Sequence, residues 1–376
     1  MKIVYFDNAA TTQVREEVLK EMIPYFYVEY GNPSSIYSIG RKAKKKIEES
    51  REKIAKQIGA NSGEIYFTSC GSESDNLAIK GVCYASQKKH IITTKIEHHA
   101  VLETCKQLEK EGYKVTYLGV EKNGRINLKE LEKAITKETL LISIMFANNE
   151  IGSIQPIKEI GEIARKNNII FHTDAVQAMG NIQIDVNELK IDLLSMSAHK
   201  FYGPKGVGAL YVRDGVNFKK IQNGGHQEKN KRAGTENVAG IVGMAKALEI
   251  SYKNFEKRNK YVKELRNYAI QRIKDSAGDI VVNGGMINRL PGNINVSIKN
   301  MDSDFLLYKL DEKGICASTG SACNSGQSDL SHVLVAIGTP LEYISGSLRI
   351  TLGEKNTKKE VDYFIECLKD IIKVLE

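Results

Sequence analysis

Short runs of β-branched and aromatic residues alternate with helical segments between residues 64 and 212, and this alternation constrains the fold more than any other feature. Apolar residues recur at helical spacing between the runs, as in Ile157, Ile160 and Ile163. Strands that alternate with helices form mainly parallel sheets covered on both faces, so the sequence predicts an α/β fold. The expected strands are residues 64–68, 91–93, 115–118, 140–146, 169–172, 192–195 and 208–212.

The pattern changes after about residue 240, where a long charged helical stretch precedes a second set of strands, expected at residues 279–282 and 293–297. A chain of 376 residues is long enough for two domains. No linker rich in proline, glycine or serine separates the halves. We therefore expect a smaller second domain that packs closely against the first.

Composition and charge exclude several classes of protein. Hydrophobic residues make up 41% and charged residues 27% of the chain, which argues against disordered, collagen-like and coiled-coil proteins. The net charge of +8 comes with no nucleic-acid-binding motif, so no direct binding to nucleic acid is expected. Neither a signal-like start nor an apolar stretch of membrane-spanning length occurs, so we expect a cytoplasmic protein without a membrane span. The six cysteines lack zinc-binding spacing, so we expect free thiols and no metal site.

Residues 68–75, Thr-Ser-Cys-Gly-Ser-Glu-Ser-Asp, lead from an expected strand through small residues into an expected helix. Backbone amides at such a helix start can bind phosphate. The segment matches neither the triphosphate-binding nor the dinucleotide-binding glycine motif. An ordinary strand–helix turn would look the same, so both interpretations stay open at this point.

Asp174 follows the apolar run at residues 169–172. The carboxyl ends of parallel strands are where α/β proteins bind ligands. A carboxylate buried there needs a cation or hydrogen-bond donors to stay ionised, because burial alone raises its pKa. A ligand contact and a helix cap both fit this position.

Lys200 lies beside hydroxyl and imidazole groups in residues 197–206, ahead of a glycine-containing turn. A lysine in this setting can act as an amine nucleophile towards carbonyl groups, although a solvated surface charge is the ordinary role of lysine. Pyridoxal-phosphate enzymes combine such a lysine with an acid for the pyridinium nitrogen and with a phosphate site. Candidates for all three parts are present in this sequence.

The motifs, in their order along the chain, resemble those of one known family. They are residues 5–12, 31–35, 73–76, 97–98, 148–152, 174–177, 197–206, 232–235 and 320–323. On these motifs the chain resembles the class V pyridoxal-phosphate enzymes, and among them the cysteine desulfurases of the NifS/IscS family. The resemblance implies an aspartate aminotransferase-like fold with a large cofactor-binding domain, residues 13–255, that contains the mainly parallel sheet. Residues 1–12 and 256–376 would form a smaller α+β domain that carries the catalytic cysteine loop.

The resemblance also implies a cofactor site for pyridoxal 5'-phosphate. Lys200 would bind the cofactor covalently, Asp174 would pair with the pyridinium nitrogen, and His98 would stack on the ring. Asn149 and Gln177 would lie beside the ring hydroxyl. The phosphate would be bound by Gly71, Ser72, Ser197 and His199, and by Thr235 of a neighbouring subunit, which implies a homodimer.

Two further residues would act on the substrate, L-cysteine. Arg349 matches the arginine that binds the substrate carboxylate, beside Asn149, although a surface salt bridge would also explain it. Cys323 lies among small polar residues, as expected for a sulfur carrier that reaches both substrate and acceptor. The thiolate is the reactive form, and His98 is the first candidate for the base that generates it. The other cysteines lie in apolar or tight-turn contexts and are expected to pack in the core.

The activity implied is conversion of L-cysteine to L-alanine, with the sulfur carried as a persulfide on Cys323 for iron–sulfur cluster assembly or another acceptor. A selenocysteine lyase or an aminotransferase would share the fold, but Cys323 favours the desulfurase. A non-catalytic sulfur-trafficking protein is the alternative outside enzymes. Lys200, Asp174 and Arg349 together argue against it.

Overall fold

The computed structural model describes residues 3–276, 278–320 and 330–375, so Cys323 lies outside the described residues. Its largest sheet has seven strands among these residues, and the pairings from β4 through β3, β5 and β6 to β7 are parallel. In spatial order the strands are β2 (Ile65–Thr68), β8 (Gly208–Val212), β7 (Leu193–Ser197), β6 (Ile170–Asp174), β5 (Thr139–Ser143), β3 (His90–Thr94) and β4 (Lys114–Leu118). The prediction of a mainly parallel α/β sheet is therefore confirmed.

β8 departs from the parallel arrangement, because it runs antiparallel to both β7 and β2. The connection from β7 to β8 contains only a single short helix, η2 (Ala198–Lys200), and a loop. A parallel return would need a longer crossover, usually through an α-helix. This short connection is the segment that carries Lys200.

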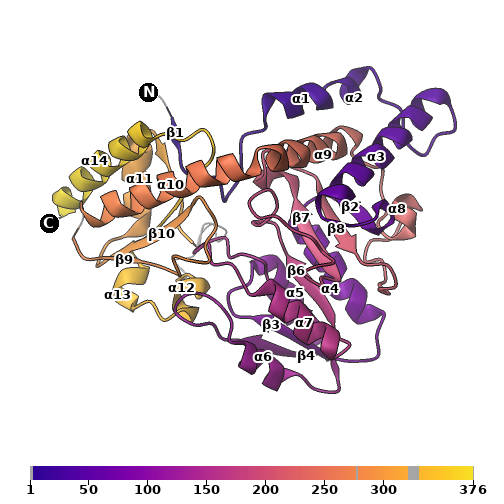
Figure 1. Ribbon diagram of the computed structural model, residues 1–376, viewed down its shortest axis with the longest axis horizontal. Helices are drawn as coiled ribbons and strands as arrows, with labels where there is room; N and C mark the ends of the chain where they lie inside the picture. Colours follow the sequence, from indigo (N-terminus) through magenta and orange to yellow (C-terminus); the bar gives the residue numbers. More distant parts are fainter. Residues whose placement is uncertain (1–2, 277, 321–329, 376) are drawn as a thin grey trace.

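Helices cover both faces of the sheet (Figure 1). One apolar core lies under α3 (Ser38–Gln57), α7 (Ile157–Lys166) and α9 (Val238–Lys253), together with α1 (Glu16–Met22) and α6 (Leu128–Ala134). The other lies under α4 (Gly71–Tyr84) and α5 (His99–Lys110). Strands buried on both faces explain why their sequences read as continuous apolar runs instead of alternating ones.

A second assembly is built on a smaller antiparallel sheet in the order β12 (Ser347–Thr351), β10 (Asn293–Ile298) and β9 (Ile280–Val282). Its core contains side chains of Val4 and Phe6 together with residues from α10 (Phe255–Lys274), α11 (Ser303–Glu312) and α14 (Lys358–Leu375). A short parallel pair, β1 (Val4–Tyr5) with β11 (Ile315–Cys316), joins the amino-terminal residues to this assembly. The exact division of the chain into residues 13–255 and the remainder stays a prediction.

Figure 1 shows the long helix α10 extending from the large assembly to the smaller one, where it lies beside α14. The shorter helices are α2 (Pro24–Tyr27), α8 (Gln227–Asn230), α12 (His332–Ala336) and α13 (Leu341–Ile344). Within the part of the chain that the structure describes, no helix has the length and apolar character needed to cross a membrane.

A buried ion pair holds a strained turn against the large sheet. Glu228, Lys229 and Asn230 have φ of 44°, 55° and 61°, a left-handed conformation that non-glycine residues seldom adopt. Arg51 of α3 donates two hydrogen bonds of 2.7 and 2.8 Å to the Glu228 carboxylate, which also accepts one from the Phe67 amide. These contacts offset the strain and fix the segment that leads to Thr235.

We expect Glu228→Ala to lower the free energy of unfolding by about 3 kcal/mol, because it removes the buried partner of Arg51 and leaves only the longer contact with the half-exposed Glu48. Chemical denaturation followed by circular dichroism measures the change. Glu162→Ala is the control, since Glu162 pairs with Lys190 where both side chains are at least 39% exposed. It should cost less than about 1 kcal/mol. Equal losses in the two variants would contradict this account of the turn.

Candidate active site

A cavity of about 250 Å³ opens at the carboxyl ends of β6 and β7. Ten side chains or glycines expected from the sequence to bind cofactor or substrate line this one cavity, including Lys200, Asp174 and Arg349. The others are Gly71, Ser72, His98, Asn149, Gln177, Ser197 and His199. The parallel register explains the convergence, because it places the ends of neighbouring strands at one edge of the sheet.

Of the expected residues that the structure describes, Thr235 does not line the cavity. Thr235 is exposed, after the strained turn at residues 228–230. Cys323 is outside the described residues, but Gly320, just before that segment, does line the cavity. The described chain therefore approaches the cavity three residues before Cys323.

One end of the cavity suits a phosphate. α4 begins at Gly71 directly after β2, so the unpaired amides of its first turn are at the cavity wall. A Cβ at position 71 would lie 2.6 Å from Cγ2 of Val176, so only glycine allows this close approach. Ser197 is 2% exposed, and its Oγ has no hydrogen-bond partner among the described residues. An orphaned buried hydroxyl beside a helix start is what a phosphate group would satisfy.

Asp174 is the last residue of β6 and is 7% exposed. Burial raises the pKa of its carboxyl group, and the nearby His98 and Lys200 offset part of this rise. Its Oδ1 also accepts a hydrogen bond of 2.9 Å from the Val176 amide, so the local capping role and a place in the cavity wall coexist. A protonated pyridinium nitrogen would supply the positive charge that favours the ionised carboxylate.

Below Asp174 lies a buried polar layer that sequence reasoning did not assign. His172 Nε2 is 3.6 Å from Asp75 Oδ1 and 3.0 Å from Ser195 Oγ. Burial lowers the pKa of His172 to about 3, and burial together with the Asp174 charge raises the pKa of Asp75 well above its ordinary value. His172 is therefore neutral at pH 7, and the raised pKa of Asp75 disfavours a second negative charge beside Asp174. Asp75 follows Gly71 by one helical turn, and this spacing could have indicated from the sequence that both residues face the same site.

Lys200 ends η2, and its Nζ donates hydrogen bonds of 2.6 and 2.7 Å to the carbonyl oxygens of Ala9 and Ala10. Gln177 Nε2 donates to the same Ala9 oxygen at 3.0 Å. The amine therefore lies in the cavity wall, held by the amino-terminal segment. Lys200 is therefore not a solvated charge on the protein surface.

His98 caps the amino terminus of α5, where its Nδ1 accepts a hydrogen bond of 3.1 Å from the Ala100 amide. Burial lowers the pKa of His98, which favours the neutral ring. A neutral imidazole whose Nδ1 accepts carries its proton on Nε2. While this cap is kept, His98 Nε2 can donate a hydrogen bond but cannot accept a proton.

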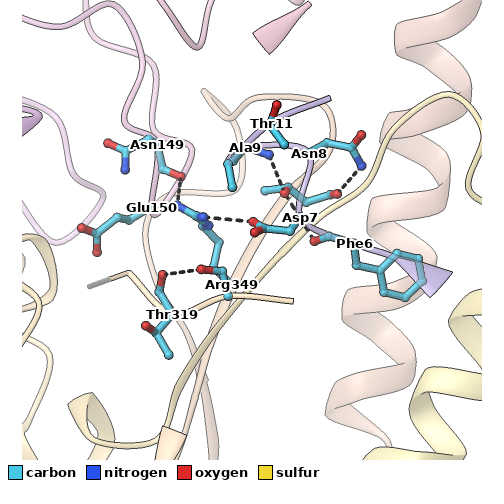
Figure 2. A network of polar contacts seen from close by, with 12 residues as sticks. Phe6, Asp7, Asn8, Ala9, Thr11, Asn149, Glu150, Thr319 and Arg349 are labelled. Carbon is cyan, nitrogen blue, oxygen red and sulfur yellow. Dashed lines mark hydrogen bonds and ion pairs between the residues drawn. The ribbon is translucent and has the colours of Figure 1, made fainter. Parts of the chain in front are cut away.

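Arg349 projects from β12 of the smaller sheet, and its side chain is 5% exposed. Figure 2 shows its guanidinium between Asp7 and Asn149. Nη2 is 3.0 Å from Asp7 Oδ1, and Nη1 donates to the Asn149 carbonyl oxygen at 3.4 Å. The salt bridge is therefore buried in the cavity wall instead of lying on the surface. Its acid, Asp7, belongs to a motif of the resemblance but was given no role.

Comparison with known proteins agrees with this geometry. The chain matches the family described as aminotransferase class-V over residues 4–364. It is 54% identical to a cysteine desulfurase IscS of Clostridium botulinum over 99% of this chain and 95% of that protein. A solved structure titled NIFS-like protein superposes with a TM-score of 0.94 at 41% identity, covering 99% of this chain and 100% of that one. A structure titled SspA in complex with cysteine gives 0.84 at 39% identity, covering 94% and 100%.

The chain belongs to the class-V aminotransferase family and is a pyridoxal-phosphate-dependent enzyme. Within that family it groups with the cysteine desulfurases of NifS and IscS type. The residues in the cavity wall fit the cofactor: an amine for its aldehyde, an acid for its ring nitrogen, and a glycine helix start with an orphaned serine for its phosphate.

Ser197→Ala is expected to weaken pyridoxal 5'-phosphate binding to the apoprotein about tenfold or more, because a hydrogen bond to a charged group is lost. The stability of the apoprotein should not fall, since the removed hydroxyl has no partner in the described chain. Titration of the apoprotein and thermal melting measure the two effects.

Ser251→Ala provides the matched control. Ser251 is completely buried in α9 and accepts a hydrogen bond of 3.0 Å from Arg15, outside the cavity. This variant should lose stability and keep its cofactor affinity. A Ser197 variant that behaved in the same way would exclude a phosphate contact.

Proposed function

We propose that this chain is a cysteine desulfurase that binds L-cysteine in the cavity and transfers its sulfur to Cys323, releasing L-alanine. The observation that carries the proposal is the convergence of Lys200, Asp174 and Arg349 on one cavity that Gly320 also lines. An amine, a buried acid and a carboxylate-binding arginine are the parts that amino-acid chemistry with this cofactor requires.

Bound pyridoxal phosphate supplies an aldehyde for amines and a conjugated ring that takes up an electron pair. Lys200 would hold the cofactor between turnovers and, once its amine is released, would move the proton at the substrate Cα. The carbonyl oxygens of Ala9 and Ala10 hold its amine in place. Asp174 would provide the negative charge that keeps the ring nitrogen protonated, and the raised pKa of Asp75 and the neutral His172 disfavour a competing charge close by.

Arg349 binds the substrate carboxylate and so orients the Cα proton towards Lys200. Planar guanidinium and carboxylate groups form paired hydrogen bonds, which fix direction as well as position. Arg349 for the carboxylate and Lys200 for the Cα proton together suit an α-amino acid as the substrate. Gly320, three residues before Cys323 in the chain, lines the same cavity as Arg349 and Lys200.

The sulfur transfer is balanced without an oxidant. The Cys323 thiolate attacks the substrate sulfur, the carbon–sulfur bond breaks, and protonation at carbon completes L-alanine. Thiol and L-cysteine together contain the same atoms as persulfide and L-alanine. His98 can orient a group in the cavity by a hydrogen bond from Nε2 while Nδ1 caps α5, but its neutral ring does not supply the proton to carbon. The role of His98 as the base that generates the thiolate stays a prediction, and it would require Nδ1 or Nε2 to be free to accept the proton.

The persulfide would pass to an iron–sulfur assembly protein or another sulfur acceptor. We place the reaction in the cytoplasm, where thiols stay reduced. In support, the described cysteines, Cys70, Cys83, Cys105, Cys316 and Cys367, are all free thiols.

We also propose a homodimer. Exposed apolar side chains gather on α2 and the segments beside it, where Phe26, Tyr27 and Tyr30 are 64%, 68% and 68% exposed and Ile36 is 87% exposed. Large exposed apolar patches mark protein interfaces. Thr235 is exposed and does not line its own cavity, so a second copy is the partner whose phosphate it can reach.

The purified protein should show a visible absorption band that shifts when L-cysteine is added. With a thiol reductant present, alanine and sulfide should then appear in equal amounts. Keto-acid formation would favour an aminotransferase, and a strong preference for selenocysteine would favour the lyase. A protein that stays colourless with added pyridoxal phosphate would exclude the proposal.

Cys323→Ser should keep the band and lose sulfide release, whereas Cys316→Ser, which changes a half-buried thiol in β11, should keep both.

For the dimer, light scattering should give twice the chain mass of 41.9 kDa. Phe26→Asp combined with Tyr27→Asp should shift the mass towards that of one chain, because charges would be buried in the interface. Tyr308→Asp is the control, since Tyr308 is also 62% exposed but lies on α11. A dimer that persists in the double variant would move the interface elsewhere.

A further inference from the structure

The carboxylate-binding arginine is already paired in the described chain. Arg349 Nη2 lies 3.0 Å from Asp7 Oδ1, and the two side chains are 5% and 17% exposed. A buried guanidinium without an acid would be costly, because desolvation of a charge is repaid only by a close partner. Asp7 is the acid in direct contact with Arg349 and helps it to lie in the cavity wall before substrate arrives, and the buried Glu150 is close enough to interact with the same guanidinium.

Asp7 is held firmly to the strand that carries Arg349. Position 7 forms a bridge with Thr351, two residues after Arg349 on β12. The Thr351 amide donates to the Phe6 carbonyl oxygen at 2.6 Å, and its hydroxyl accepts from the Ala9 amide at 2.8 Å. Hydrogen bonds on both sides of position 7 leave the Asp7 backbone little freedom to withdraw.

The contacts with Asp7 and Asn149 do not use all the N–H groups of the Arg349 guanidinium. Asp7 and the Asn149 carbonyl accept from Nη2 and Nη1, whereas Nε is buried and has no hydrogen-bond partner among the described residues. A guanidinium has five N–H groups. Arg349 therefore retains donors for a second carboxylate while Asp7 stays in place (Figure 2).

We propose that Asp7 is a positioning residue for substrate recognition: it orients the Arg349 guanidinium and remains bound to it while the α-carboxylate of the substrate occupies the other donors. This inference rests on the proposed function, because it assumes that Arg349 receives the carboxylate. The alternative arrangement is competition, in which the substrate carboxylate displaces Asp7. The two arrangements predict opposite changes in affinity.

The same segment connects the arginine to the lysine. Two and three residues after Asp7, the carbonyl oxygens of Ala9 and Ala10 accept from Lys200 Nζ. Thr12, further along, donates its amide to the His199 carbonyl oxygen at 2.9 Å. Residues 6–12 thus span from β12 to the Lys200 turn, and they set the separation between the group that binds the carboxylate and the group that moves the proton.

The test compares two ligands that differ only in the carboxylate, L-cysteine and cysteamine. Their dissociation constants are measured from the shift of the cofactor band in a Cys323→Ser background, so that the ligand is not consumed. Asp7→Ala should weaken L-cysteine binding at least tenfold, equivalent to about 1.4 kcal/mol, and leave cysteamine binding within about twofold. Asp7→Asn, which keeps an oxygen acceptor, should lie between the wild type and Asp7→Ala. In the active protein, KM should rise while kcat changes less than about threefold.

Glu354→Ala is the matched control. Glu354 forms a 2.7 Å ion pair with Arg15, whose side chain is 7% exposed, and neither residue lines the cavity. This variant should lose stability and keep both affinities. Cofactor content and thermal melting of each variant show whether it folds.

The outcomes separate the inference from the function on which it rests. Tighter or unchanged L-cysteine binding in Asp7→Ala would overturn the positioning role, and tighter binding would establish competition. An equal loss for L-cysteine and cysteamine would also overturn it, since the effect would not depend on the carboxylate. A parent protein that does not bind L-cysteine more tightly than cysteamine would instead overturn the assignment of Arg349.

Discussion

Parallel pairing of β6 with β7 is the constraint on which the site depends. The register joins His172 to Leu193 and Asp174 to Ser195, so both strands end at the same edge of the sheet. Ser197 and the Lys200 turn follow from β7, and Asp174 ends β6. A shift of one residue in this register would turn each of these side chains to the opposite face of the sheet.

Burial, as well as nearby charges, determines which acids around the cavity are ionised. Three carboxyl groups, Asp75, Glu97 and Asp174, lie near one another, and burial raises the pKa of each. For Glu97 the value rises to about 8, so it is mainly protonated at pH 7. Such groups cannot all be ionised in a medium of low polarity. Asp174 is the one with His98 and Lys200 close by, which makes it the acid that can hold the charge.

The two assemblies contribute different parts of the chemistry, and residues 6–12 join them. The large sheet provides the phosphate end, Asp174 and Lys200, whereas β12 of the smaller sheet provides Arg349. Side chains of the amino-terminal segment pack in the smaller core through Val4 and Phe6, while the carbonyl groups of Ala9 and Ala10 hold Lys200. A substrate bound between Arg349 and Lys200 therefore contacts groups whose spacing this one segment controls.

The sequence by itself determined the α/β class, the expected strands and the residue types for the chemistry, because buried parallel strands and turn segments leave local patterns. It also identified ten of the residues that line the cavity, through motifs in a specific order. Only the tertiary structure decided that β8 runs antiparallel, that His172 contacts Asp75 in a buried polar layer, and that Asp7 pairs with Arg349 across 342 residues of chain. Such contacts leave no local pattern, because their free energy comes from burial and from partners distant in the sequence.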